Sequence, residues 1–283
     1  MNNKSLILEG GGMRGVYTAG VLDYLQEHYI EFDQIIGVSA GTCHGCSYIS
    51  KQKGRAYKVN TDYLDDKNYL SWSNLIKDGS IFNMNMLFNT IPNELYPIDD
   101  KVYNNSNTKL FATCTNLNTG KAEYFHIKDI NSDSKYIEAG CSIPGLANIV
   151  YINSEPYLDG GIGDSLPIKK AIQDGYKKNI VILTRDIEYT KDRNKMMNIL
   201  KFKYHKYPNF VNAIRARHIN YNNTLKFIKK EEAKGNCFVI RPSKPLNISN
   251  LEKNKVVLKD IYDLGYNDAK NNYDSLIMFI NSL

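Results

Sequence analysis

The stretch FDQIIGVSAG, residues 32–41, joins a short apolar strand to the start of a helix. The pattern predicts a strand over Phe32–Gly37, followed by a helix rich in small residues. Ser39 falls in the turn between them, where a strained backbone pushes a hydroxyl out above the end of a sheet. Gly37 and Gly41 suit this turn because larger side chains would clash there. We therefore predict that Ser39 is a nucleophile, aided by the positive end of the helix dipole.

A second unit of the same kind precedes the first. LILE, at Leu6–Glu9, is a short apolar strand that runs into the loop GGGMRG, residues 10–15. Beyond the loop, apolar residues recur at helical spacing at Val16, Ala19, Leu22 and Leu25. Strands that alternate with helices indicate a parallel sheet covered on both faces.

The loop GGGMRG satisfies the dinucleotide-binding pattern G-x-G-x-x-G through Gly10, Gly12 and Gly15. A nucleotide site would require an acidic residue about twenty positions later, at the end of the second strand. Here the second strand runs directly into the Ser39 turn. A glycine loop beside a nucleophile can instead direct its free N–H groups at the oxyanion of a tetrahedral intermediate. We favour this use and keep a nucleotide-binding module as the less favoured alternative.

A nucleophilic serine needs a base within hydrogen-bond reach. The five histidines lack a strand-end loop context, and His44, the nearest in sequence, should lie inside the helix after Ser39, turned away from the hydroxyl. The better candidate is Asp159 in YLDGG, where Gly160 and Gly161 follow a carboxylate at the end of a short apolar stretch. DGG alone indicates only a turn, but beside the other two motifs it points to a catalytic base. The other histidines are His28, His126, His205 and His218.

The remaining chain alternates strands and helices. Expected strands lie at 109–117 and 121–127, as a hairpin, at 179–184 and at 237–242, with helices near 137–141 and over 251–271. Between Lys51 and Asp100 the pattern is less regular and rich in Met and aromatic residues. Core packing is the commoner explanation of such a stretch, and an acyl-lined pocket is the alternative.

The 283 residues, 42% of them hydrophobic, are enough for one large core. The net charge of +6 is uneven: residues 191–234 hold twelve Lys/Arg against three Asp/Glu, a balance of +9 that leaves −3 elsewhere. This segment either meets phosphate-bearing surfaces or forms a solvated lysine-rich face. The N-terminus does not read as a signal peptide, and no run of eighteen apolar residues occurs. Five cysteines without regular spacing favour a reduced, cytoplasmic protein.

In order and spacing, GGGMRG, GVSAG and DGG resemble the three sequence blocks of the patatin-like phospholipases. The connecting segments FATCTNLNTGKAEYF, EAGCSIPGL and LDGGIGDSLPIKKAIQDGY are also similar to that family, over about residues 5–185. The resemblance implies a Ser39–Asp159 dyad. It also implies an oxyanion hole at Gly11, Gly12, Met13 and Arg14. One departure is Cys43-His44-Gly45-Cys46, where small apolar residues are expected; buried small side chains explain it better than a metal or redox pair.

We therefore expect a three-layer α/β/α sandwich with a mainly parallel sheet. Residues 1–185 should form the catalytic core and residues 186–283 a basic helical extension packed on it. The expected activity is hydrolysis of lipid carboxylic esters through an acyl-enzyme, without metal or cofactor. The alternative is a catalytically silent lipid- or membrane-binding protein of the same fold. Expected partners are lipid or acyl-ester substrates and, peripherally, the anionic inner face of a membrane, but not nucleic acid.

Overall fold

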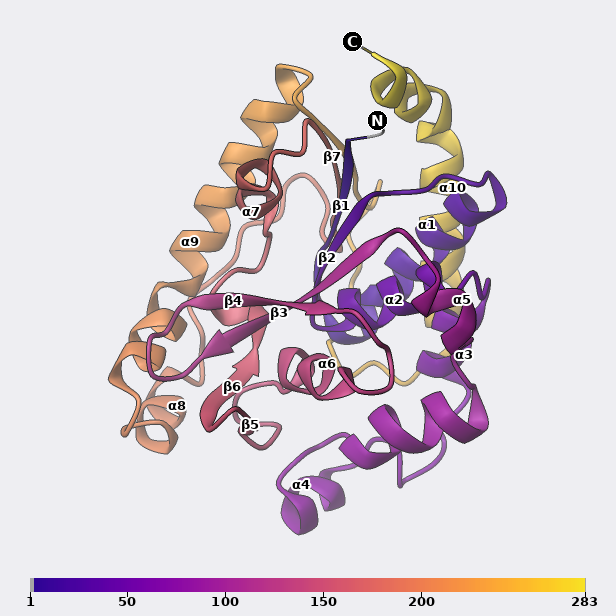
Figure 1. Ribbon diagram of the computed structural model, residues 1–283. Helices are drawn as coiled ribbons and strands as arrows, with labels where there is room; N and C mark the ends of the chain where they lie inside the picture. The colour runs from indigo at the N-terminus through magenta and orange to yellow at the C-terminus, as the bar shows by residue number, and fades with distance from the viewer. Residues whose placement is uncertain (1–2, 283) are drawn as a thin grey trace.

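The computed structural model describes residues 3–282 and contains one eight-stranded sheet over that range (Figure 1). The strand order is β5-β6-β3-β2-β1-β7-β8, and β4 pairs with β3. The strands are β1 (Lys4–Leu8), β2 (Gln34–Val38), β3 (Lys109–Asn116), β4 (Ala122–Ile127), β5 (Val150–Ile152), β6 (Glu155–Asp159), β7 (Lys178–Ile182) and β8 (Cys237–Ile240).

Five neighbouring strands, β3, β2, β1, β7 and β8, run parallel, whereas β4, β5 and β6 pair antiparallel. The expected mainly parallel sheet is confirmed. The expected hairpin is also present as β3 and β4. The strand predicted near the C-terminus, β8, forms the edge of the sheet beside β7, so the last third of the chain contributes to the sheet itself.

Helices cover both faces of the sheet. Successive side chains of a strand point to opposite faces, and in β1 Leu6 and Leu8 join one core cluster while Ile7 joins another. The first cluster lies under α1 (Gly15–Glu27), α2 (Ala40–Ile49) and α10 (Lys255–Asn281). The second lies under α7 (Ile168–Gln173) and α9 (Pro208–Ala233). The fold therefore has three layers, with the sheet between two layers of helices, as expected.

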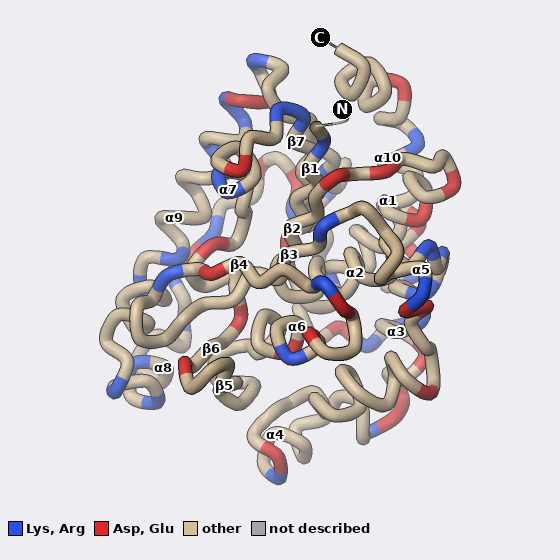
Figure 2. The backbone as a smooth tube through the Cα atoms, in the orientation of Figure 1, with Lys and Arg blue, Asp and Glu red and all other residues tan. Residues whose placement is uncertain are grey.

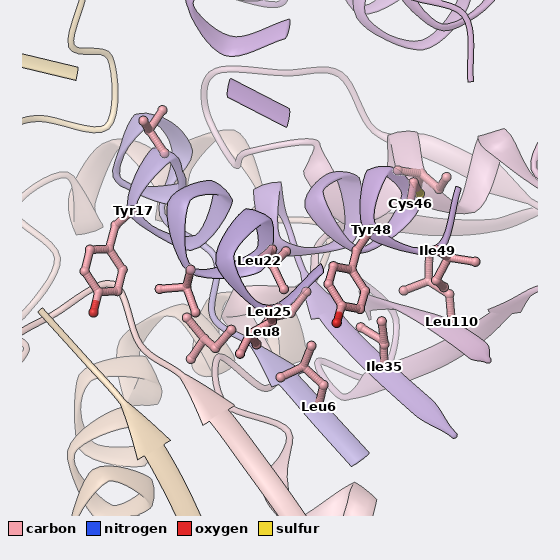
Figure 3. Packing of buried hydrophobic residues seen from close by; sticks show 14 of the residues in the cluster. Leu6, Leu8, Tyr17, Leu22, Leu25, Ile35, Cys46, Tyr48, Ile49 and Leu110 are labelled. Carbon is pink, nitrogen blue, oxygen red and sulfur yellow. The ribbon is translucent and has the colours of Figure 1, made fainter. Parts of the chain in front are cut away.

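The first cluster shows why the N-terminal helix forms where the apolar spacing places it. Leu22 and Leu25 of α1 meet Leu6 and Leu8 of β1, with Ile35 of β2 beside them (Figure 3). All five side chains are buried. Burial of each such side chain stabilises the fold by about 1.5–3 kcal/mol relative to exposure.

The irregular middle segment folds into short helices. They are α3 (Arg55–Thr61), α4 (Trp72–Asp78), the π-helix η2 (Met86–Leu95) and α5 (Asp100–Asn104). Pro92 lies inside η2; proline lacks the N–H that a regular α-helix requires at that point. After β4, α6 (Ser134–Cys141) occupies the position expected for a short helix.

The C-terminal region packs closely on the core. The closing helix was predicted over 251–271, but α10 begins at Lys255, where the Asn254 side chain accepts from the N–H groups of Val256 and Val257. It also continues to Asn281, because Leu276 keeps an apolar, buried position beyond the predicted end. The division at residue 185 stays a prediction. No helix within residues 3–282 is long and apolar enough to cross a membrane.

Candidate active site

Ser39 lies between β2 and α2, as the sequence predicts. Its backbone has φ 53° and ψ −129°, a conformation that a non-glycine residue rarely adopts. The glycines on either side are required by close contacts: a Cβ on Gly37 would lie 2.4 Å from Thr42 Cα, and one on Gly41 would lie 2.6 Å from the Leu8 carbonyl oxygen. The strand, turn and helix therefore form a nucleophile elbow.

Asp159 reaches the same point from a strand that runs the opposite way. β3 projects beyond the end of β2, since Thr113 pairs with Val38 and β3 continues to Asn116. β6 returns along this projection, and its last residue, Asp159, pairs with Cys114. Asp159 therefore lies at the same position along the strand direction as the turn that carries Ser39. A Cβ on Gly160 would lie 2.0 Å from the Thr113 carbonyl oxygen, so the next residue must be glycine.

The Asp159 carboxylate is buried and hydrogen-bonded. Burial raises its pKa above the usual value, while the Ser39 hydroxyl, the Arg217 charge and the Gly161 N–H lower it. The Gly161 N–H donates to Oδ1 at 2.7 Å. The Ser39 side chain thus lies near enough to the desolvated carboxylate to act on its pKa, and desolvation makes a carboxylate a stronger base.

The glycine loop forms the 3-10 turn η1 (Gly12–Arg14) next to the elbow. The Met13 N–H donates to the Asn250 carbonyl at 3.1 Å, and the Arg14 N–H donates to the Gly11 carbonyl at 3.2 Å. Among the described residues, the N–H groups of Gly11 and Gly12 have no hydrogen-bond partner. Of the four residues expected to form the oxyanion hole, these two have main-chain donors available.

None of the five histidines forms a hydrogen bond to Ser39 or Asp159 within residues 3–282. His44 is buried in α2, as expected of a packed residue, and its Nε2 would lie 2.6 Å from a Cβ on Gly15. Burial lowers the pKa of His44 to about 4. His44 is also among the residues that line the cavity described below, and within the described chain neither of its ring nitrogens has a hydrogen-bond partner.

A cavity of about 640 Å³ opens beside Ser39 and Gly12. Much of its wall comes from the irregular middle segment that the sequence assigned in the first instance to core packing. Four of the apolar side chains in that segment, which are only partly buried, line the cavity: Phe82, Met84, Leu87 and Phe88. Both explanations apply: the side chains line the cavity, and Phe82, Leu87 and Phe88 also pack against the first core cluster, to which Ile81 belongs.

Cys43 pairs with Cys141, which is distant in the sequence, and not with its sequence neighbour Cys46. Cys46 packs in the core, while Cys43 faces the cavity with its sulfur 3.7 Å from that of Cys141 at the end of α6. The contact with Cys141, and to a lesser degree the charge of Arg55, lower the pKa of Cys43.

Two residues with clear roles at the site carried no recognisable sequence signal. Arg217 of α9 donates from Nε to the Gly161 carbonyl and acts on the charge of Asp159. Asn250 holds the glycine loop through Met13, and its carbonyl oxygen would lie 2.6 Å from a Cβ on Gly12. Both lie far along the chain in segments without a motif, where only the fold brings them to the site.

The chain belongs to the patatin-like phospholipase family, whose profile matches residues 6–172. A separate profile, a domain of unknown function designated DUF6363, matches residues 207–281. The family has a lipid hydrolase function, in agreement with the expected class of enzyme.

Similarity extends to individual proteins. The uncharacterized protein YjjU of Escherichia coli K12 is 29% identical over 266 residues, which cover 92% of this chain and 74% of YjjU. Lysophospholipase NTE1 of Kluyveromyces lactis is 25% identical over 92% of this chain, but the match spans only 18% of NTE1. The crystal structure of VipD from Legionella pneumophila superposes with a TM-score of 0.52 at 14% identity, over 97% of this chain and 67% of VipD, which supports the shared fold.

Proposed function

We propose that the protein hydrolyses carboxylic esters of lipids, with Ser39 as nucleophile and Asp159 as base. The observation that carries this proposal is the strained turn that places Ser39 beside a buried carboxylate and beside a cavity lined in part by apolar side chains. The cavity volume suits an acyl chain, because ligand sites of about 300–1,000 Å³ enclose small molecules well.

The reaction proceeds in two halves. Ser39 Oγ attacks the carbonyl carbon and passes its proton to Asp159, while the N–H groups of Gly11 and Gly12 stabilise the oxyanion. Asp159 then protonates the departing alcohol, and the acyl group stays on Ser39. In the second half, water gives a proton to Asp159 and attacks the acyl-enzyme. Ser39 recovers the proton as the fatty acid leaves.

The proposal is tested by fatty-acid release from a panel of phospholipids, lysophospholipids and neutral acyl esters, measured by mass spectrometry. Wild-type protein should release acid from at least one member, and Ser39→Ala should release none above background. Ser243→Ala, at an exposed serine after β8, is the matched control and should retain activity. Release that persists in Ser39→Ala would contradict the assignment.

We also propose that the enzyme docks peripherally on anionic membranes. α8 (Met197–Lys203) and the residue before it expose Met196, Ile199 and Phe202 beside Lys201 and Lys203. Figure 2 shows basic positions along the backbone of α8. Apolar side chains among lysines suit the surface of an anionic bilayer.

One loop lies between the C-terminal end of α8 and the cavity. The Gly145 N–H donates to the Tyr204 hydroxyl just after α8, and Ile143 lines the cavity. The same loop reaches α4, where the Asn148 amide donates to the Asp78 carbonyl.

Vesicle flotation tests the docking. Binding to anionic vesicles should weaken steeply with added salt, because charges on the surface are screened. Phe202→Ser should weaken it further, whereas Ile219→Ser, at an exposed position of α9, should not. Equal, salt-independent binding to neutral and anionic vesicles would contradict the proposal.

A further inference from the structure

Two cysteine side chains meet on the wall of the cavity beside Ser39. Cys43 lies in the first turn of α2, and Cys141 is the last residue of α6. Their sulfur atoms are 3.7 Å apart, and both residues line the cavity. Both are partly exposed, whereas the other three cysteines are buried. Cys43 and Cys141, which we call the thiol pair, are therefore the cysteines most open to a molecule in the cavity.

A buried cation favours the thiolate form of Cys43. Arg55, at the start of α3, lines the same cavity and is 9% exposed. In the described part of the chain it has no carboxylate oxygen within 4.0 Å. Its guanidinium donates to the Ser47 hydroxyl at 2.9 Å, one helical turn beyond Cys43. The contact with Cys141 and then the Arg55 charge lower the pKa of Cys43, against the effect of burial. The thiolate is the form of cysteine that acts as a nucleophile.

The thiol pair also connects the two segments that carry the site residues. Ser39 is the N-cap of α2, one helical turn before Cys43. Ser142 follows Cys141, and its carbonyl oxygen accepts from the Asp159 N–H at 2.9 Å. Disulfide sulfurs lie about 2.05 Å apart, so closure from 3.7 Å must move both side chains and the segments to which they belong. A misplacement of about 1 Å between reacting groups lowers a rate by about 10²-fold.

We propose that the thiol pair is a redox modification site, at which a hydroperoxide converts the two thiols into a disulfide and stops ester hydrolysis. The loss of hydrolysis rests on the proposed esterase function, but formation of the disulfide does not. Hydroperoxides suit the site because a thiolate attacks their terminal oxygen directly. The cavity of about 640 Å³, lined in part by apolar side chains, has room for hydrogen peroxide and for an organic hydroperoxide.

The reaction takes two steps. The Cys43 thiolate attacks the terminal oxygen of the hydroperoxide, the O–O bond breaks, and the departing alkoxide takes up the proton that the thiol has lost. The Cys141 sulfur then attacks the sulfenic acid on Cys43; the S–O bond breaks, and hydroxide leaves with the Cys141 proton as water. Both sulfurs are oxidised, and the hydroperoxide is reduced to an alcohol or, from hydrogen peroxide, to water. An added dithiol reverses the change by thiol–disulfide exchange.

The first experiment maps the disulfide. Reduced wild-type protein is treated with equimolar hydrogen peroxide or cumene hydroperoxide, free thiols are alkylated, and peptides are identified by mass spectrometry. We expect a linked Cys43–Cys141 peptide that dithiothreitol removes, and the faster of the two oxidants shows whether a small or an apolar hydroperoxide is preferred. Cys141→Ala should instead hold a sulfenic acid on Cys43, which dimedone captures. Cys237→Ala, which removes a buried thiol from the second core cluster, should form the same disulfide as wild type. A link between other cysteines, or no link with either oxidant, would overturn the proposal.

A second experiment separates the thiol pair from the esterase chemistry. Hydrolysis of one ester is measured for each protein when reduced, when oxidised and after dithiothreitol, and each protein is compared with its own reduced form. Wild type and Cys237→Ala should lose about 10-fold or more on oxidation and recover on reduction, whereas Cys43→Ala should change less than about twofold.

The two parts of the proposal fail in different ways. If the disulfide forms but the reduced protein hydrolyses no ester, the esterase function fails and the modification site stands. If reduced and oxidised wild type hydrolyse the ester equally, the disulfide does not control the site and that part of the proposal is overturned. A loss that dithiothreitol does not reverse, or an equal loss in Cys43→Ala, would place the oxidation elsewhere and overturn it as well.

Discussion

The two sides of Ser39 differ in chemistry and in origin. The cavity on one side is lined by apolar side chains together with several asparagines and the charged Arg55, Lys135 and Glu138. It takes much of its wall from a segment of short helices between α2 and β3. The other side of Asp159 is bordered by the chain beyond β7, from which Arg217 of α9 donates to the Gly161 carbonyl and acts on the Asp159 charge. We propose that the cavity takes the acyl half of the ester, whereas Arg217 lies outside the cavity lining. Changes to the cavity and changes to Arg217 should therefore have separable effects on activity.

Removal of the Asp159 carboxylate should give the largest effect, because hydrolysis of every ester would require this base. Asp159→Asn keeps the shape of the side chain and removes the proton acceptor, so kcat should fall by about 10²–10⁴ for every ester. Steady-state kinetics with thermal melts would separate lost chemistry from lost fold. Variants of His28, His44, His126, His205 and His218 should lose far less. A folded histidine variant as inactive as Asp159→Asn would require a third member of the site.

A change confined to the cavity should alter chain-length preference alone. Leu87 lines the cavity and is partly buried, so Leu87→Trp should fill part of the acyl space. We expect kcat/KM for long-chain esters to fall about 10-fold, with short-chain esters much less affected. Competition between two chain lengths in one reaction measures this directly. A uniform loss across chain lengths would show that the cavity does not hold the acyl group.

Replacement of Arg217 should shift the pH dependence of kcat/KM. The base must be ionised, and burial already raises the pKa of Asp159, so activity should fall on acidification at a higher pH than for an ordinary carboxyl. Arg217 opposes this rise. Arg217→Gln should therefore shift the acid limb of kcat/KM for a neutral ester to higher pH, and Arg217→Lys should shift it less. An unmoved limb would contradict the influence of Arg217 on Asp159.

The smallest expected effect concerns stability. Because the pKa of Asp159 is raised in the folded state, the unfolded chain binds fewer protons between the two pKa values, and stability declines as pH rises through that window. Asp159→Asn should therefore melt above wild type at neutral pH, and the difference should vanish at acidic pH. A variant that melts below wild type at both pH values would show that the carboxylate is structurally required.

The three motifs could be located from the sequence because neighbouring backbone comes so close to them that several positions accept only glycine. The contacts at Gly37, Gly41 and Gly160 leave no room for a Cβ, so only glycine fits at these positions. The turns can therefore be recognised from their glycines. Apolar spacing likewise predicted α1, since its positions face the sheet.

Other features depend on the fold and could not be predicted. The return of β6 along the overhang of β3 depends on strand register, and no local pattern in the sequence encodes it. Arg217 and Lys191 lie in a segment whose charge suggested a surface role, yet both side chains are partly buried beside the site. Helical spacing alone does not distinguish a solvated cation from one that faces a functional site.

Covalent trapping tests the central claim most directly. Wild-type protein is incubated with a fluorophosphonate, and its intact mass and labelled peptide are measured. We predict one adduct, on Ser39, that is absent in Ser39→Ala and forms much more slowly in Asp159→Asn. An adduct on another residue, or a folded wild-type protein that takes no label, would contradict the assignment of Ser39 as the nucleophile.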